Sequence, residues 1–566
     1  MQHPTTITEN GAPSFSTTND ARLDLFSKVC RDTETDRLAG LLERSWAVSP
    51  LDTLKIVFHL RDCRGGKGER QQFTNAMKWV LDNHRQEFVV NFPHIPFYGR
   101  WKDLLGFFGT AYEAEMVKYY ASQLQSDLGC LLMAGGMEKK VSLAAKYAPS
   151  EGQAFDTKYQ AAAKFAKSLG MNKRGYRVNV LRPLRTQIDS NALLLERHMT
   201  DRPEDWDSID FSKVPSIALK KYKRAFERHQ KERYAAYLES VTKGEKKINV
   251  MRLMPHQLVG EYIKEGVHVS GDAPDPTVEA QWKAFVDGTR ATTKFDNAIA
   301  MVDVSGSMGG SFTGKKGVAP ITVSVALGIL IAELSTGPFG GKFITFSANP
   351  TLHSLQGNTL YAKCEAMATG VAENTNIQRA FDLLLNSAKM FNATPEQMPK
   401  TLFIFSDMQF DCINGGTAIG GSYGPNGWTP SAPQKTNFDV IKAKYVEAGY
   451  QMPRVVFWNL RGDTDDFVVT SNEEGVSCLS GFSSDILNLI VDGEEISPVK
   501  VMLKAINNPR YDRIRLEIPP PLIPQGSASS SVTTSTAAGI QQNFEETPTT
   551  TTIGGTSTDP NGCILA

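Results

Sequence analysis

The sequence predicts a two-part α + α/β protein, an N-terminal α-helical repeat domain followed by a doubly wound α/β domain. The chain has 566 residues, which is too long for one hydrophobic core. Amphipathic patterns separated by Pro- and Gly-marked turns dominate residues 21–290. Short apolar runs rich in Val, Ile and Phe then alternate with helical patterns in residues 291–515. Strands alternating with helices indicate a parallel sheet covered on both faces.

The helical half is expected to begin after a polar, disordered segment at residues 1–20. In "PLDTLKIVFHLRDCRGGKGER", Leu54, Val57 and Phe58 have helical spacing, and two glycines end the pattern. The segments "RWKDLLGFF", "EMVKYYASQLQSDL" and "YKRAFERHQKERYAAYLESV" repeat this style. No fixed period links them, but many modest amphipathic helices favour a stack of helical hairpins of the HEAT-like kind.

Four apolar runs predict the strands of the second half: "NAIAMVDV", "GKFITFS", "TLFIFSDM" and "RVVFWNL". Helical patterns lie between them at residues 320–334 and 376–391. Ligands of such sheets bind at the carboxyl ends of the strands. Residues 516–566 are rich in Ser, Thr and Pro and predict a disordered tail.

Composition narrows the class of protein. Lys plus Arg and Asp plus Glu both total 61, so a surface built wholly for nucleic acid is disfavoured, although a local basic patch is not. No run reaches the ~18 apolar residues of a membrane span, and the N-terminus lacks the features of a secretory signal. Seven cysteines without CxxC spacing indicate reduced thiols and no structural zinc. The expected compartment is the cytoplasm.

Three segments are expected to bring oxygen-bearing side chains to the strand ends. Asp303, Ser305 and Ser307 follow the first strand, Thr375 precedes a helix, and Asp407 follows a later strand. Carboxylates and hydroxyls without His or Cys suit Mg²⁺, with Mn²⁺ or Ca²⁺ as alternatives, and disfavour zinc. With no general base or nucleophile among them, these residues predict a binding site and no enzyme. An acidic side chain of a partner protein would complete the coordination.

The D-x-S-x-S pattern with its later Thr and Asp resembles the von Willebrand factor type A domain and its metal-ion-dependent adhesion site. The resemblance covers about residues 295–500 and implies a doubly wound, Rossmann-like fold with those five residues as the metal set. Three enzyme motifs fit less well. A haloacid dehalogenase requires Asp where Ser305 stands, and a nucleophile elbow requires a Gly that "SGSMG" lacks. "GGSFTGKK" departs from a P-loop because Lys316 replaces Ser or Thr.

A second resemblance spans about residues 25–495. The segments "TLKIVFHLRDCRGGKGER", "FYGRWKDLL", "MVDVSGSM", "FSDMQFD", "VVFWNLRG" and "SGFSSDIL" are similar to the family known as domain of unknown function 2828. That family joins a helical region to a von Willebrand type A domain. The Ro RNA-binding autoantigen has the same order, and its helical repeats form a ring that binds RNA. RNA is therefore a partner implied by likeness of architecture; DNA is not expected.

Two clusters in the helical half carry this RNA expectation. Cations that flank glycines can hold phosphates, and mixed aromatic and basic groups are typical of single-strand binders. The residues are Arg61, Arg64, Lys67 and Arg70 in the first cluster, and Tyr98, Arg100, Trp101 and Lys102 in the second. The alternative interpretations are a turn between helices and an aromatic side chain that anchors a helix start.

The sequence thus predicts a non-catalytic binding or scaffold protein with a divalent-metal site, and an RNA-binding ribonucleoprotein component is one form of such a protein. A purely protein-binding scaffold and, less favoured, a metal-dependent hydrolase remain alternatives. The final residues "CILA" have the C-a-a-X form, which predicts farnesylation of Cys563. A single lipid chain gives only marginal attachment, so membrane contact is expected only if that cysteine is prenylated.

Overall fold

The protein is described by a computed structural model that covers residues 5–517 with gaps. The gaps are 9–12, 134–140, 190–194, 196–197, 200–202, 251–252, 264–268, 270–272, 294, 310–317, 346–349, 369–376, 391, 411–420, 425–426, 431–436, 465 and 491–493. Thr375 and Cys563 therefore lie outside the described residues, as does the expected disordered tail beyond Glu517. Within the described part, no helix is long and apolar enough to cross a membrane.

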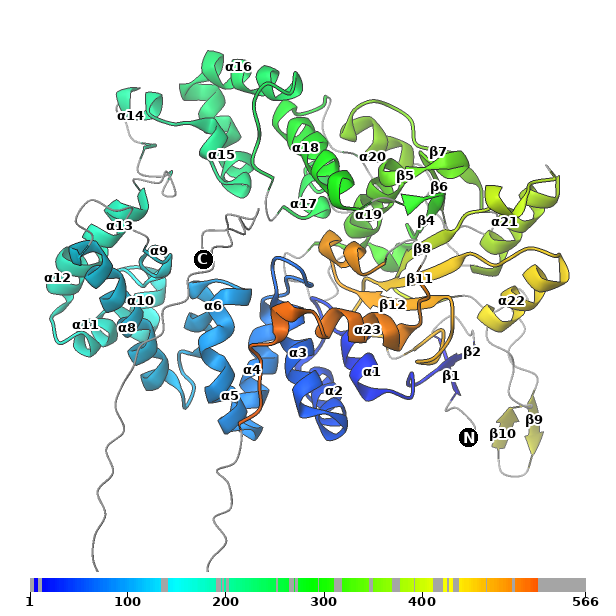
Figure 1. Ribbon diagram of the computed structural model, residues 1–566, viewed down its shortest axis with the longest axis horizontal. Helices are drawn as coiled ribbons and strands as arrows, with labels where there is room; N and C mark the ends of the chain where they lie inside the picture. The colour runs from blue at the N-terminus through cyan, green and yellow to red at the C-terminus, as the bar shows by residue number, and fades with distance from the viewer. Residues whose placement is uncertain are drawn as a thin grey trace, which may run out of the picture.

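The N-terminal region is helical and bends round in an arc (Figure 1). Its α-helices are α1 (Ala21–Lys28), α2 (Thr35–Val48), α3 (Pro50–Arg61), α4 (Gln71–Asn83), α5 (Arg85–Asn91), α6 (Ile95–Tyr98), α7 (Trp101–Leu104), α8 (Glu113–Met133), α9 (Ala144–Tyr147), α10 (Ala154–Tyr159), α11 (Ala161–Ser168), α12 (Lys173–Gly175), α13 (Arg182–Asp189), α14 (Pro203–Asp207), α15 (Ser216–His229), α16 (Lys231–Thr242), α17 (Pro255–Val259) and α18 (Pro276–Thr292). Local signals set several starts: Asp275 caps α18, and proline follows at its first position.

The C-terminal region is built on a six-stranded, mostly parallel sheet in the order β12-β11-β8-β4-β6-β7. The strands are β4 (Ala298–Val302), β6 (Lys342–Thr345), β7 (Leu352–Ser354), β8 (Thr401–Ser406), β11 (Arg454–Asn459) and β12 (Val476–Ser480). Only β7 is antiparallel to its neighbour. Short pairs lie apart from this sheet: β1 (Thr5–Ile7) with β2 (Pro13–Phe15), β3 (Phe295–Asp296) with β5 (Ser335–Thr336), and β9 (Gly421–Gly424) with β10 (Gly427–Pro430).

Helices cover both faces of the sheet. The other helices of this region are α19 (Pro320–Leu334), α20 (Leu360–Ala368), α21 (Ile377–Met390), α22 (Asn437–Glu447) and α23 (Pro498–Ile506). Alternate residues of β4 enter two separate cores, because side chains of a strand point to opposite faces. Ala300 and Val302 join the core that contains α19, whereas Ile299 and Met301 join the core that contains α21 and α22.

Both ends of the helical arc contact the sheet region. At the beginning of the chain, α1 packs on β12 and α3 packs on α23; at the end of the arc, α17 and α18 pack on α19. Figure 1 shows the blue helices and the green helices reaching the sheet from two sides. The sheet region therefore joins the first and last helices of the arc.

Residues 1–20 were expected to be disordered, but the described residues among them form ordered structure. β1 and β2 pair antiparallel, and the Phe15 amide donates to the Phe467 carbonyl at 2.9 Å. The Thr18 side chain and amide both bond to Asp24 of α1. A polar composition predicted disorder here, but these groups find partners nearby in β1, β2 and α1 and, for Phe15, far along the chain at Phe467.

Candidate functional site

The carboxyl ends of β4 and β8 bring two aspartates together. The two strands are parallel neighbours, with Val302 paired with Phe405, so Asp303 and Asp407 follow at the same edge of the sheet. Both carboxylates are completely buried. Ser305 is also buried, whereas Ser307 is exposed in the short turn of 3-10 helix that follows. The structure therefore brings Asp303, Ser305, Ser307 and Asp407 to one edge of the sheet.

Hydrogen bonds fix the two carboxylates. The Ser406 hydroxyl donates to Asp303 Oδ2 at 2.6 Å and lies 3.5 Å from Asp407 Oδ1. The Ser305 amide donates to Asp303 Oδ1 at 3.0 Å. The hydroxyls of Ser305 and Ser307 are 3.0 Å apart. Ser406, which the sequence analysis did not select, therefore links the two aspartates; its place as the last residue of the apolar run "TLFIFS" was the available signal.

One guanidinium enters the same site. Arg461 Nη1 donates to Asp407 Oδ2 at 3.2 Å, and its other nitrogens hold Asp463. Burial raises the pKa of Asp303, and the nearby charge of Asp407 raises it further, against hydrogen bonds from Ser406 and Ser305 that lower it. The site thus concentrates negative charge that Arg461 offsets only on the Asp407 side.

The donor set fits a hard divalent cation. Two carboxylates and two hydroxyls are the oxygen ligands that Mg²⁺, Mn²⁺ and Ca²⁺ prefer. Asp303, Ser305, Ser307 and Asp407 are the described residues that would hold it. The described residues contain no group of three or more His, Cys, Asp or Glu side chains placed to hold a metal. A cation here would therefore depend on serine hydroxyls as well as carboxylates.

Four of the residues expected to contact RNA lie in the interior. Arg61 forms an ion pair with Asp103 at 2.6 Å. Lys67 is buried between α1 and β12, where its Nζ donates to the Phe26 and Val29 carbonyls and to the Ser480 hydroxyl. Tyr98 and Trp101 are core residues. Their burial is at odds with phosphate or base contact, and it gives them a structural role.

The other four expected RNA contacts are of two kinds: two are half buried and held by hydrogen bonds, and two are exposed. Arg64 Nη1 donates to the Phe97 carbonyl at 2.6 Å, and the amide of half-buried Arg100 donates to Asp103. Arg70 and Lys102 are exposed, and both line one groove. Lys78, Lys146, Arg182 and Arg185 line the same groove and were missed by sequence reasoning, because they are spread over three helices, α4, α9 and α13.

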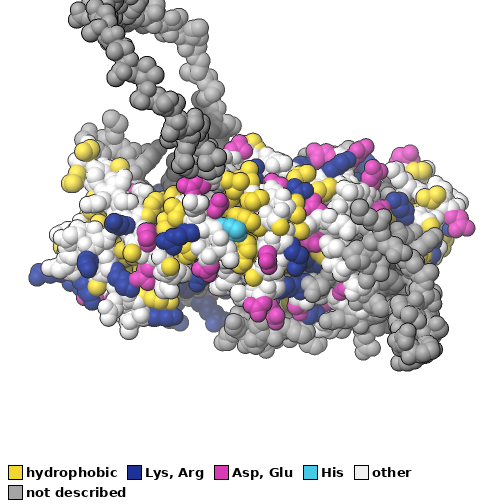
Figure 2. Space-filling view, turned by 90° about the horizontal axis from the view of Figure 1, so that it is seen from below, with side chains coloured by type: hydrophobic (Ala, Val, Ile, Leu, Met, Phe, Trp, Pro, Cys, Tyr) yellow, Lys and Arg dark blue, Asp and Glu magenta, His cyan; other side chains and the backbone are white. Residues whose placement is uncertain are grey.

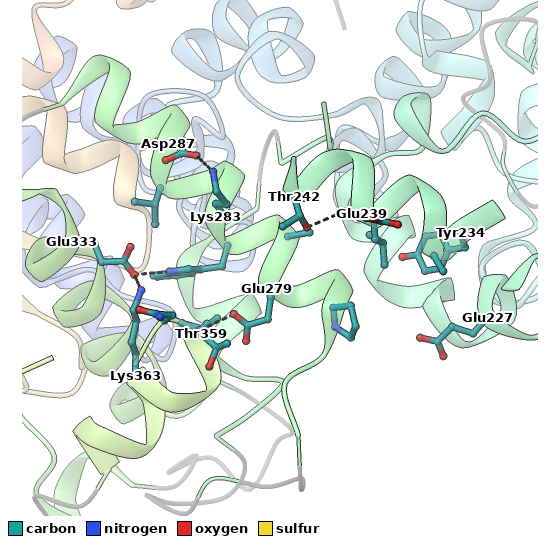
Figure 3. Close-up of a pocket in the computed structure, with 18 of the residues that line it drawn as sticks. Glu227, Tyr234, Glu239, Thr242, Glu279, Lys283, Asp287, Glu333, Thr359 and Lys363 are labelled. Carbon is teal, nitrogen blue, oxygen red and sulfur yellow. Dashed lines mark hydrogen bonds and ion pairs between the residues drawn. The ribbon is translucent and has the colours of Figure 1, made fainter. Parts of the chain in front are cut away.

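A second cavity of about 880 Å³ lies where the helical arc meets the sheet region (Figure 3). α16 and α18 form one side, and Glu333 and the start of α20 form the other. Some of its charged side chains are paired within the lining: Glu333 accepts from Lys363 and from the Trp282 indole, both at 2.8 Å, and Asp287 pairs with Lys283. This internal pairing indicates a structural junction.

The fold and the site define the class: a helical region joined to a mostly parallel α/β sheet domain with an oxygen-rich strand edge. The chain belongs to the family described as domain of unknown function DUF2828, whose sequence profile matches residues 8–117 and 111–295. A second profile, domain of unknown function DUF7788, matches residues 297–513. The two profiles meet between α18 and β4, where the helical region gives way to the sheet.

Two individual proteins are similar over most of the chain. Uncharacterized protein L728 of Acanthamoeba polyphaga mimivirus is 33% identical over 535 residues, which cover 88% of this chain and 87% of the viral protein. The crystal structure of the Deinococcus radiodurans RO (RSR) protein is 14% identical, with a TM-score of 0.38. That match covers 86% of this chain and 99% of the bacterial one.

Proposed function

We propose that the protein is a non-catalytic binding protein whose sheet region is a von Willebrand type A domain with a divalent cation, Mg²⁺ or else Mn²⁺ or Ca²⁺. The ligands would be Asp303, Ser305, Ser307, Thr375 and Asp407. The observation that carries the proposal is the pair of fully buried aspartates at adjacent strand ends, joined through Ser406. Two neighbouring buried carboxylates are unfavourable unless a cation or a proton offsets their charge.

The arrangement supports binding chemistry. The bound cation would offer a coordination position to an acidic side chain of a partner protein. The chain's own residues would orient that contact: Ser406 fixes the Asp303 carboxylate, and Ser307 lies exposed at the rim. Arg461 and Gln409, which also contact Asp407, are held in hydrogen bonds of their own. A metal-dependent hydrolase is the less favoured alternative.

Calorimetry with Mg²⁺ tests the metal site. Asp303→Ala should abolish binding and keep the fold, because it removes one of two mutually repelling buried carboxylates. The matched control is Asp296→Ala, an aspartate of β3 whose side chain is 59% exposed and pairs with Lys400. The control should bind Mg²⁺ as the wild type does. Equal affinity in wild type and Asp303→Ala would refute the assignment, and so would a wild type that binds no divalent cation.

RNA binding by the helical region, proposed to be a HEAT-like repeat, is the second candidate function. It is supported by the exposed cations Arg70 and Lys102 and by the basic groove that they line. The full chain should bind RNA with an affinity whose logarithm falls linearly with the logarithm of salt concentration. Absence of binding at low salt would leave a purely protein-binding scaffold.

The cytoplasmic location and the farnesylation of Cys563 are further parts of the proposal. The intact mass of the protein isolated from its own cells measures the farnesylation directly. A farnesylated and trimmed chain lacks Ile564–Ala566 and carries the added lipid on the cysteine. A chain that still ends in Ala566 without added mass contradicts it.

A further inference from the structure

The groove lined by Arg70 and Lys102 is strongly basic. Its volume is about 990 Å³, and α4, α7, α9, α10 and α13 contribute to its wall. Six of its lining residues are cationic: Arg70, Lys78, Lys102, Lys146, Arg182 and Arg185. None of the described lining residues is Asp or Glu. In a protein of net charge zero, such one-signed lining favours an anionic ligand.

Two of these cations also hold the groove together. Arg185 donates to the carbonyls of Ala145 and Ala148 and to the Ser150 hydroxyl, each at 2.9 Å, so it fixes the wall formed by residues 145–150. Arg70 Nε lies 2.9 Å from Asp103. A ligand would therefore meet a wall that is already in place, which lowers the entropic cost of binding.

Three other cations remain available to a ligand. Within the described part of the chain, the side chains of Lys78, Lys102 and Arg182 have no hydrogen-bond or ion-pair partner, and the last two are exposed. They come from α4, α7 and α13, so they approach the cavity from different elements. Cations on three separate helices can contact successive negative charges of a polymeric ligand, whereas one compact anion would contact fewer of them.

Aromatic side chains complete the lining. Phe108, Phe155 and Tyr159 form a cluster whose ring centroids lie 4.9 to 5.4 Å apart. Phe155, Tyr159 and Tyr147 are only half buried, and all three line the groove. Half-exposed rings among unpaired cations are the combination by which proteins bind single-stranded nucleic acids, with phosphates on the cations and bases stacked on the rings.

We infer that this groove binds single-stranded RNA, with backbone phosphates held by Lys78, Lys102 and Arg182 and bases stacked on Tyr147, Phe155 and Tyr159. The inference rests on the proposed RNA binding and names its site. A cavity of this size accepts a molecule of drug size, so a flexible strand can enter it and a folded domain cannot. An acidic peptide would use the cations but would leave the rings without partners.

The surroundings favour the approach of such a ligand. On the face seen in Figure 2, Lys and Arg side chains gather toward the left end, where α8 to α12 lie in Figure 1. A field of one sign near a binding groove raises the association rate of an oppositely charged ligand, and salt reduces the effect.

The experiment measures fluorescence anisotropy of labelled oligouridine of about 16 nucleotides with the full-length protein over a salt series. The first variant is Lys102→Glu with Arg182→Glu; its control is Lys118→Glu with Arg228→Glu, two exposed residues outside the groove. Both pairs change the net charge equally. The second variant is Tyr147→Ala with Tyr159→Ala.

The groove variant should lose about tenfold or more in affinity, and its salt slope should fall by about 1.4, or ~0.7 for each of two phosphates. The control pair should retain its slope. The tyrosine variant should lose about tenfold for each stacked base with the slope unchanged, and polyglutamate should compete poorly with RNA.

Three results would overturn the inference. If wild type binds RNA and both charge-reversed pairs weaken it equally, RNA binding stands but the groove is not its site. If polyglutamate competes as well as RNA and the tyrosine variant is unaffected, the groove binds acidic peptides. If wild type binds no RNA at low salt, the RNA proposal and the groove assignment both fail.

Discussion

His59 lies in the apolar interior, where its ring packs against Phe26 and Tyr511 with centroids 5.3 and 6.0 Å away. Neither ring nitrogen has a hydrogen-bond partner. Burial, helped by the charge of Lys67, lowers its pKa to about 3. Burial likewise lowers the pKa of His256 to about 3. Both side chains must therefore be neutral in the folded protein, whereas the unfolded chain takes up protons near pH 6.5.

These two histidines predict acid sensitivity. Because the unfolded state binds more protons, stability falls as the pH drops from about 6.5 toward 3, by about 2 kcal/mol per histidine at pH 5. Thermal unfolding of wild type and His59→Leu at pH 7 and pH 5 measures this. The variant should lose less stability between the two pH values; an identical loss would show that His59 is not responsible.

Arg461 predicts how the proposed metal site is tuned. Its guanidinium beside Asp407 offsets negative charge that would otherwise attract a cation. Arg461→Gln should therefore strengthen Mg²⁺ binding several-fold, and Arg461→Lys should leave it near the wild-type value. Calorimetry measures both; weaker binding by the glutamine variant would mean that Arg461 supports the site by positioning Asp407.

At the scale of elements, the contact of α19 with β4 sets the position of Asp303. Gly328 allows this contact, since a Cβ at that position would lie 2.4 Å from Val302 Cγ2. Gly328→Ala should destabilise the protein by about 1–3 kcal/mol through overpacking. Gly288→Ala is the matched control: this glycine of α18 has open space around it, so alanine should stabilise by about 0.5–1 kcal/mol. Thermal midpoints that move in the same direction would contradict the packing argument.

Strands that are buried on both faces and consist almost wholly of apolar residues could be predicted from the sequence. β4, β6, β8 and β11 are nearly continuous apolar runs, as buried parallel strands are. β12, "VSCLS", was not predicted, because Ser477 and Ser480 interrupt the run although both are completely buried. The Ser480 hydroxyl lies near the Phe26 and Val29 carbonyls, which are more than 400 positions away in the sequence.

The candidate sites show the same limit. Asp303, Ser305 and Asp407 could be found because each lies at or just beyond the carboxyl end of a predicted strand. The basic groove could not, because its cations are spread over α4, α7, α9 and α13. Conversely, "RDCRGGKGER" has several cations close together in the sequence, but two of them are not available to a ligand. Arg61 forms an ion pair with Asp103, and Lys67 donates a hydrogen bond to Ser480 of β12. Local spacing does not reveal a partner that only the fold brings near.

For the whole molecule, Lys67 is the side chain that joins the first helices to the sheet edge. Lys67→Met would leave three buried acceptors, the Phe26 and Val29 carbonyls and the Ser480 hydroxyl, without its ammonium group. Stability should fall by about 3 kcal/mol or more, and amide hydrogen exchange should accelerate in both α1 and β12. Lys118→Met, at an exposed position of α8, is the control. Faster exchange confined to α1 would mean that this bond does not couple the two regions.

The packing of α1 on β12 has a consequence for how the chain folds during its synthesis on the ribosome. Val29 and its partner Ser480 are separated by 451 positions. At about 5–20 residues per second, the first helices wait roughly 20 to 90 s after synthesis before the strand that covers them is made. During that interval the apolar face of α1, with Leu23 and Phe26, has no sheet to cover it. Nascent chains interrupted before β12 should therefore bind chaperones. Synthesis of β12 should then complete the folding of the first helices.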